Sequence, residues 1–454
     1  MAAETALHFD RFLLPAGWKQ NVRVRVRDGQ FAEIAPDSEA EAGRERYAIG
    51  LPGLSNLHSH AFQRGMAGLA EKRSLSSDSF WTWRDVMYRF VDRLTPDDLF
   101  SIASLAYAEM LETGFTRVGE FHYLHHDRDG SMFADSAEMS GAIFAAAEET
   151  GIALTHLPVF YAHSGFGGLP PTENQRRFVH DVDSFARLMS ALEPMRNALP
   201  DAVLGIAPHS LRATTPGELS ELIGQFGRGP IHMHVAEQIR EVDDCVASTG
   251  RRPVEWLLEN AAPDERWCLV HATHMTDEET RRLALSGAVV GLCPITEANL
   301  GDGFFPIERY LQSNGRFGLG SDSNVLIDAS EEMRLLEYGQ RLVHRQRNLI
   351  STADRRSTGS NIFHAAMEGG AQALGGTAGI ATGSSADLIS IRADHPSLVG
   401  RHGDDVLDSW VFAAGRDAID CVWRRGVKVV SEGRHQRRSS IVDRYSRTLN
   451  RLTI

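Results

Sequence analysis

The sequence of 454 residues contains few cysteines and very few lysines. The cysteines are Cys245, Cys268, Cys293 and Cys421. They are far apart and form no CxxC pair, which argues against a disulfide framework and against a cysteine-based zinc site. Lysine occurs only at Lys19, Lys72 and Lys428. Chemistry that depends on a lysine therefore has few places to occur.

Long apolar runs and a positive net charge are also absent. No stretch of about 18 consecutive apolar residues occurs, as a membrane-spanning helix would need. The first residues, "MAAETALHFDRF", lack the basic and then apolar segments of a secretory signal. The formal charge of −13 at pH 7 argues against a nucleic-acid backbone as the main partner, because such binding needs clustered positive charge. We expect a cytoplasmic protein that binds neither membranes nor nucleic acids.

The order of the apolar segments predicts a (β/α)8 barrel. From residue 51 onward, short apolar runs alternate with longer helical stretches, which is typical of repeated β-α units around a parallel sheet. There are eight such runs, at 48–58, 116–121, 152–160, 202–208, 230–236, 267–272, 288–294 and 316–322. The stretch "TPDDLFSIASLAYAEMLETG" predicts a helix that begins after a cap at Thr95, has Pro96 in its first turn and ends at Gly114.

Both ends of the chain show the period-2 alternation of β-strands instead. "NVRVRVRDGQFAEIAP" indicates two strands joined at a turn of Asp28 and Gly29, and alternation returns in "ADLISIRA" and "AIDCVWRRGVKVVSEGRH". We expect an α/β fold with a TIM barrel over residues 51–379. A small β-sandwich domain would be built from residues 1–50 and 380–454. The arginine-rich tail "RHQRRSSIVDRYSRTLNRL" is interpreted as a solvated or subunit-contacting helix.

Histidines and carboxylates end four of the eight runs. They are His58 and His60 in the first run, His234 and Glu237 at the fifth, His271 in the sixth and Asp322 in the eighth. In a (β/α)8 barrel the catalytic groups lie at the C-terminal ends of the strands, so these side chains should converge. A histidine pair alone is weak evidence for a metal site. The prediction of such a site rests on all four strand ends together. Such a set suits a catalytic zinc or a similar divalent ion, which lowers the pKa of a bound water to about 7.

The positions suggest separate roles for these side chains. Glu237 is placed to move protons, and His271 to polarise the substrate or orient the hydroxide. Asp322 can be both a metal ligand and an acceptor of the proton of water. His232 shares a strand face with His234 but lies deeper in the strand, so it is interpreted as a core histidine.

Several stretches carry a resemblance to a known family. "LPGLSNLHSH", "HMHVAE", "LVHATH" and "GLGSDSN", with "GIATGSSADLISI" and "GRH" near the C-terminus, resemble the amidohydrolase superfamily over essentially the full chain. The resemblance implies a metal-bearing barrel with a β-sandwich made from both termini. Binuclear members bridge two metals with a carboxylated lysine, and this chain has no lysine between Lys72 and Lys428. We therefore expect one divalent ion, Zn²⁺ with iron as the alternative, held by His58, His60, His234 and Asp322.

Within that superfamily, "NLHSHAFQRGMAGLAE" and "SFWTWRDVMY" resemble the formimidoylglutamate deiminases more closely than the cytosine, guanine or adenosine deaminases. The resemblance implies hydrolysis of N-formimidoyl-L-glutamate to N-formyl-L-glutamate and ammonia in histidine degradation. It assigns Gln63 to the formimidoyl or metal side, and the glutamate portion to Arg84, Tyr123, His209 and Arg212. Each arginine could form a bidentate pair with a carboxylate. Trp81 and Trp83 are interpreted as packing residues, and His122, His125 and His126 as polar loop residues.

Two other readings stay open at this point. A related amidohydrolase could deaminate an aromatic base such as guanine, with an aromatic-lined pocket in which Arg84 and Arg212 are dispensable. A non-catalytic scaffold would be expected to have lost some ligands, whereas all are present. We expect a small-molecule substrate with carboxylates, and the resemblance also implies a homodimer.

Overall fold

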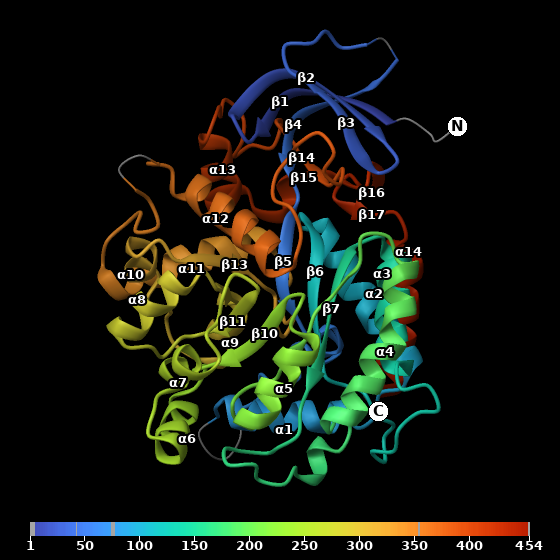
Figure 1. Ribbon diagram of the computed structural model, residues 1–454. Coiled ribbons are helices and arrows are strands. Elements are labelled where there is room, and N and C mark those ends of the chain that lie inside the picture. Colours follow the sequence, from blue (N-terminus) through green and yellow to red (C-terminus); the bar gives the residue numbers. More distant parts are fainter. Residues whose placement is uncertain (1–4, 42, 74–77, 353–354, 453–454) are drawn as a thin grey trace.

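The computed structural model describes residues 5–41, 43–73, 78–352 and 355–452 (Figure 1). Two sheets organise this part of the chain: a parallel barrel, and a second sheet at one end of the barrel where the N-terminal and C-terminal strands meet (Figure 1). The expected TIM barrel with a small β domain from both termini is confirmed.

The barrel strands run parallel in the order β10-β11-β12-β13-β5-β6-β7-β8, with β9 paired to β7. They are β5 (Leu54–Ser59), β6 (Phe115–His122), β7 (Ala153–Phe160), β8 (Val203–Leu204), β9 (Ala207–Pro208), β10 (Ile231–Val235), β11 (Trp267–His271), β12 (Val289–Leu292) and β13 (Arg316–Leu319). Ile206, between β8 and β9, closes the barrel: its N–H donates to Pro230 O (2.9 Å), and its carbonyl accepts the His232 N–H (3.0 Å). A Cβ at Gly205 would lie 2.5 Å from Pro230 O, so this close approach requires glycine.

The first apolar run forms two strands, so the prediction of one strand over 48–58 is wrong. β4 (Glu45–Pro52) belongs to the terminal sheet, and β5 begins the barrel at Leu54. Gly53 separates them, and a Cβ there would lie 2.3 Å from Thr116 Oγ1. Both strands are apolar and buried at their junction, so no polar residue marks the break. The change of sheet occurs at Gly53, beyond the predicted limit at residue 50.

The terminal strands form one continuous sheet in the order β17-β16-β15-β14-β4-β1-β2-β3. Its other strands are β1 (Thr5–Leu14), β2 (Gly17–Arg27), β3 (Gln30–Ala35), β14 (Leu388–Ile391), β15 (Ile419–Arg424), β16 (Val427–Ser431) and β17 (Arg434–His435). Asp28 and Gly29 turn between β2 and β3 with φ of 53° and 80°, as a type I′ hairpin needs. Antiparallel pairing of β14 with β4 joins the two ends of the chain.

Helices surround the barrel and cover its outer face (Figure 1). They are α1 (Phe80–Val91), α2 (Pro96–Glu112), α3 (Glu138–Thr150), α4 (Val182–Ala198), α5 (Pro216–Phe226), α6 (Ile239–Thr249), α7 (Pro253–Asn260), α8 (Asp277–Ser286), α9 (Pro294–Leu300), α10 (Ile307–Gln312), α11 (Ala329–His344), α12 (Thr358–Ala373), α13 (Asp405–Ser409) and α14 (Arg438–Leu452), with short turns η1 (Ala61–Met66), η2 (Glu173–Gln175), η3 (Trp410–Ala414) and η4 (Gly415–Ala418). None of the helices among the described residues has the length and apolar character needed to cross a bilayer.

The start of α2 follows the sequence prediction. Thr95 Oγ1 accepts the Asp98 N–H (3.2 Å), and the Asp98 carboxylate accepts the Thr95 N–H (3.0 Å). This reciprocal pair satisfies two of the N–H groups that a helix start leaves without partners.

The arginine-rich tail forms α14, which packs on the barrel helix α2. Ile441 lies in an apolar cluster with Leu105 and Ala108 of α2. Arg438 pairs with Glu109 (3.1 Å) and Glu112 (3.0 Å) of the same helix. The tail is a helix with one exposed face, as interpreted, and its apolar stripe packs on α2, which the sequence did not predict.

A buried arginine connects the two sheets, which leads to a stability prediction. Arg424 of β15 is 4% exposed and pairs with Asp387 and, at 2.9 Å, with Asp201 after α4. Removal of one partner from such a group leaves buried charge uncompensated, so Arg424→Ala should lower the free energy of unfolding by about 3–5 kcal/mol. Denaturant unfolding measures this, with the exposed Arg27→Ala as control. Equal unfolding midpoints for the two variants would contradict the assignment.

Candidate active site

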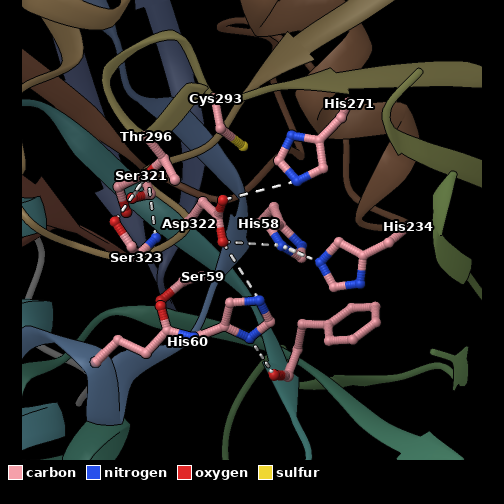
Figure 2. Close-up of polar contacts among 12 residues, drawn as sticks. His58, Ser59, His60, His234, His271, Cys293, Thr296, Ser321, Asp322 and Ser323 are labelled. Atoms are coloured by element: carbon pink, nitrogen blue, oxygen red, sulfur yellow. Dashed lines mark hydrogen bonds and ion pairs between the residues drawn. The ribbon is translucent and has the colours of Figure 1, made fainter. Parts of the chain in front are cut away.

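Three barrel strands bring the predicted metal ligands together at their C-terminal ends. His58 lies in β5 and His60 directly after it, His234 lies in β10, and Asp322 follows β13. One ligand atom from each lies within 4.8 Å of the others. Asp322 Oδ1 is 3.4 Å from His58 Nε2 and 3.3 Å from His60 Nε2, and His58 Nε2 is 3.1 Å from His234 Nε2 (Figure 2).

The hydrogen bonds of the histidines aim their lone pairs at the centre. His60 Nδ1 donates to Phe121 O (2.8 Å) and His234 Nδ1 to His209 O (3.3 Å). Because a carbonyl only accepts, Nε2 of each ring carries the lone pair. Burial lowers the pKa of His60 to about 3 and that of His234 well below its ordinary value, so both rings are neutral. Converging neutral imidazoles and a carboxylate form the donor set that fits one divalent ion.

Asp322 is held as a carboxylate by its surroundings. Burial alone would raise the pKa of Asp322. The adjacent His58, His60 and His271 rings lower it by a larger amount, so the net pKa lies below the ordinary value. The backbone of Asp322 has a φ of 43°, and that of His271 has a φ of 67°, both in the left-handed region. Such strain in non-glycine residues is typical of functional sites. Backbone bonds between Asp322 and both His58 and His60 fix the pairing of β5 with the segment after β13.

His271 lies between three carboxylates. Its Nε2 is 3.7 Å from Asp322 Oδ2 and 3.8 Å from Glu237 Oε1, and its Nδ1 is 3.2 Å from Glu297 Oε1. Burial lowers the pKa of His271, and the carboxylates outweigh burial and raise it to about 10. Burial also raises the pKa of Glu237 to about 8. Glu237 can therefore gain and lose a proton near neutral pH, whereas the His271 ring stays protonated.

Glu297 was missed by the sequence analysis. It lies on α9, beyond the end of the seventh barrel strand, and accepts the Cys293 N–H (3.0 Å) as well as contacting His271. Glu297 is four positions past Cys293 and therefore does not stand at the end of an apolar run, where the other site residues are found. An acidic residue within the first turn after a barrel strand is the one signal that could have indicated it.

The pocket above this centre is lined by all five residues that the sequence analysis assigned to the substrate: Gln63, Arg84, Tyr123, His209 and Arg212. Gln63 Nε2 donates to Tyr123 OH (2.9 Å), and the buried Gln63 Oε1 has no hydrogen-bond partner among the described residues. The wall also contains the aromatic residues Phe80, Trp83, Tyr88, Tyr161 and Phe178. The pocket thus combines polar groups near the metal ligands with an aromatic wall.

Two arginines in the pocket have no carboxylate partner. Arg84 lies on α1, with its guanidinium carbon 4.5 Å from the centre of the Trp81 ring, and Arg212 follows β9. No ion pair joins either arginine to a carboxylate within the described part of the chain, and the buried Nε of each has no hydrogen-bond partner there. Glu241 and Glu237 interact with Arg212 only over a longer distance, which contributes to its raised pKa. Arg212 is buried and Arg84 is half-buried. Buried arginines of proteins are usually paired, so these two groups are suited to a ligand with carboxylates.

Other histidines and aromatic residues lie outside the centre or differ from the expectation. His232 Nε2 bonds to Ala373 O (2.7 Å), in agreement with a core role. His125 and His126 lie in the loop after β6, as interpreted, although both are buried, whereas His122 is the last residue of β6 and not a loop residue. Trp81 and Trp83 are helical: Trp83 lines the pocket, and Trp81 lies against Arg84.

The barrel and the buried His/Asp centre define a class of metal-dependent hydrolases. Residues 49–429 match the family model described as "Amidohydrolase family", and residues 4–48 match "Formimidoylglutamate deiminase HutF, N-terminal domain". The chain belongs to the amidohydrolase family. A relative from Pseudomonas aeruginosa, named formimidoylglutamate deiminase, is 49% identical over 95% of this chain and 96% of its own length.

Two further comparisons extend this picture. The crystal structure of an amidohydrolase from Brucella melitensis superposes with a TM-score of 0.96 at 49% identity, covering 99% of this chain and 100% of its own. A 5-methylthioadenosine/S-adenosylhomocysteine deaminase from Natronomonas pharaonis is 28% identical over 91% of this chain and 89% of its own length. The deaminases of purine compounds are thus the more distant relatives.

Proposed function

We propose that the protein hydrolyses N-formimidoyl-L-glutamate to N-formyl-L-glutamate and ammonia, a step of histidine degradation. The observation that carries this proposal is the pair Arg84 and Arg212, which face the pocket of the metal ligands without carboxylate partners. The substrate has two carboxylates and a linear amidine, so it matches two cations beside a hydrolytic centre. The 49% identity to a protein named formimidoylglutamate deiminase supports the same substrate.

The centre fits one divalent ion, for which we propose Zn²⁺ with His58, His60, His234 and Asp322 as ligands. A bound ion of this kind supplies a water whose pKa is lowered to about 7. None of the three lysines lines the pocket, so a carboxylated lysine that bridges two ions has no place here. We therefore propose a mononuclear centre.

The reaction forms one C–O bond and breaks one C–N bond at the formimidoyl carbon. The oxygen of water bonds to that carbon while Glu237 receives a proton from the water and passes it to the imine nitrogen. His271 donates from Nε2 to the oxygen of the tetrahedral adduct. Asp322 accepts the remaining proton of that oxygen, and this proton is returned through Glu237 to the departing nitrogen. The C–N bond then breaks, and the nitrogen, which has now gained two protons, leaves as ammonia.

The rest of the pocket orients the amino acid portion. Arg84 and Arg212 each bind a carboxylate of the glutamate, with Tyr123 and His209 beside them. Gln63 Oε1, which has no partner within the described part of the chain, accepts an N–H of the formimidoyl group. This arrangement places the reacting carbon over the metal ligands, and orientation of this kind is a major source of rate enhancement.

The test is ammonia release from N-formimidoyl-L-glutamate compared with guanine, adenosine and 5-methylthioadenosine. The purines are included because Trp83 and Phe178 in the wall could stack on an aromatic base. Turnover of formimidoylglutamate alone is expected, and turnover of a purine without it would overturn the proposal. Metal analysis is expected to give about one equivalent, whereas a scaffold would bind none. The homodimer and the cytoplasmic location stay predictions.

Glu297 leads to a prediction about a positioning residue. Its carboxylate fixes the His271 ring through Nδ1, so Glu297→Gln should lower kcat by roughly 10-fold and leave KM and metal content nearly unchanged. A shift of the pH dependence of kcat should accompany the loss, which a purely structural defect would not produce. Steady-state kinetics from pH 6 to 9 measure both quantities, and a variant with unchanged kcat and pH dependence would remove Glu297 from this role.

A further inference from the structure

A second cluster of possible metal ligands lies beside the first. One donor atom each from His271, Cys293 and Asp322 lies within 4.8 Å of the other two. Cys293 follows β12, the strand between β11 and β13 in the barrel. Its thiol points toward the space beside His271 and Asp322 (Figure 2). The three side chains are buried, with exposures of 1%, 0% and 5%.

Asp322 is shared between the two clusters through different oxygens. Oδ1 faces His58 and His60, and Oδ2 faces His271 Nε2 at 3.7 Å. One carboxylate can therefore bind a cation in each cluster, as bridging carboxylates of two-metal sites do at ion separations of about 3.5–4 Å. His271 Nε2 is the ring nitrogen available to the second cluster, because Nδ1 is bound to Glu297.

The surroundings of this second cluster favour a positive charge, which the protonated His271 ring supplies and which a bound cation would supply in place of the ring proton. Besides Asp322, the carboxylates of Glu237 and Glu297 lie 3.8 Å and 3.2 Å from the nitrogens of the His271 ring. Three carboxylates in a buried region interact strongly with a cation because solvent screens them little. The thiol of Cys293 selects among cations, because sulfur ligands favour soft ions such as Zn²⁺ and Cd²⁺ over Mg²⁺ and Ca²⁺.

We propose that His271, Cys293 and Asp322 form a second, weaker site for a thiophilic divalent cation, and that its occupation inhibits the enzyme. Binding releases the thiol proton of Cys293 and the Nε2 proton of His271 to solvent, and forms bonds from the cation to sulfur, to His271 Nε2 and to Asp322 Oδ2. The last two atoms are those that face the reacting group in the proposed mechanism. Inhibition therefore rests on the proposed function, whereas binding does not.

The experiment titrates Cd²⁺ into holoenzyme that contains one equivalent of its own metal. Bound metal, the ultraviolet charge-transfer band of a thiolate–cadmium bond and ammonia release are followed together. Wild type is compared with Cys293→Ala and with the matched control Cys268→Ala, which removes a second fully buried thiol of the same apolar cluster. We expect wild type and C268A to bind a second equivalent with the band and to lose activity. In C293A the second equivalent should bind at least about 10-fold more weakly, without the band.

Several outcomes would overturn the proposal. They are the absence of a second equivalent in wild type, a second equivalent without the thiolate band, and equal inhibition of C293A and wild type. Analysis of the original metal in the same samples shows whether Cd²⁺ has replaced it at the first centre instead. If C293A does not fold, Cys293→Ser takes its place as the variant without a thiol. The presence or absence of the thiolate–cadmium band in the wild type also still tests whether Cys293 binds the cation. Metal content and the band remain informative even if formimidoylglutamate is not the substrate.

Discussion

Substitution of Glu237 by glutamine is expected to lower kcat for formimidoylglutamate by about 10²- to 10⁴-fold, the range that proton transfer by a positioned side chain contributes. Glu237 is 5% exposed, lines the pocket and lies 3.8 Å from His271. Glutamine has the same size and can still form hydrogen bonds, but it cannot carry a proton from water to the imine nitrogen. The loss should therefore fall on kcat, with KM changed little.

The control for this variant is Glu173→Gln, which changes a carboxylate whose side chain is 85% exposed. Both variants should contain the same amount of metal as the wild type, since Glu237 is not among the four converging ligands. A Glu237→Gln enzyme with full metal content and a kcat within about threefold of wild type would exclude Glu237 as the proton carrier. If the Glu237→Gln enzyme instead lost its metal, Glu237 would be identified as a metal ligand.

The barrel could be predicted because each of its strands is a short buried run between helical segments. The same argument failed at residues 48–58, where one apolar run contains the ends of two strands in different sheets. It also could not predict what α14 packs on, because the partners of this helix on α2 are more than 300 residues away. Periodicity reports how a segment is buried, and it does not report what buries it.

The metal ligands could be predicted for a related reason: parallel barrel strands deliver their last side chains to one rim. The groups that orient these ligands could not be predicted. Phe121 O and His209 O are backbone atoms, which every residue has, and Glu297 lies on a helix after the rim. The sequence also could not single out the two pocket arginines, because arginine is abundant in this chain. Only the structure distinguishes arginines that pair with carboxylates, such as Arg64, from Arg84 and Arg212.

Replacement of Arg212 or of Arg84 by alanine is expected to lower kcat/KM by roughly 10²- to 10³-fold, because loss of one partner of a buried charge pair costs about 2–5 kcal/mol. The matched control is Arg240→Ala. Arg240 also lies over the Trp81 ring, at 4.9 Å, but it does not line the pocket and it contacts Asp244. Kinetics of all three variants on formimidoylglutamate measure the effect, and Arg240→Ala should retain the activity of the wild type.

N-formimidoyl-glycine, which lacks the side-chain carboxylate, separates a binding role from a packing role. An arginine that binds that carboxylate has nothing to bind in the shorter substrate, so its alanine variant should match the wild type on it. The other arginine should still matter, because its carboxylate remains. If both variants lose the same factor on both substrates, the arginines support the pocket structurally and the charge argument fails. If one loss disappears, that arginine is assigned to the side-chain carboxylate, and the dianionic substrate follows from the pocket itself.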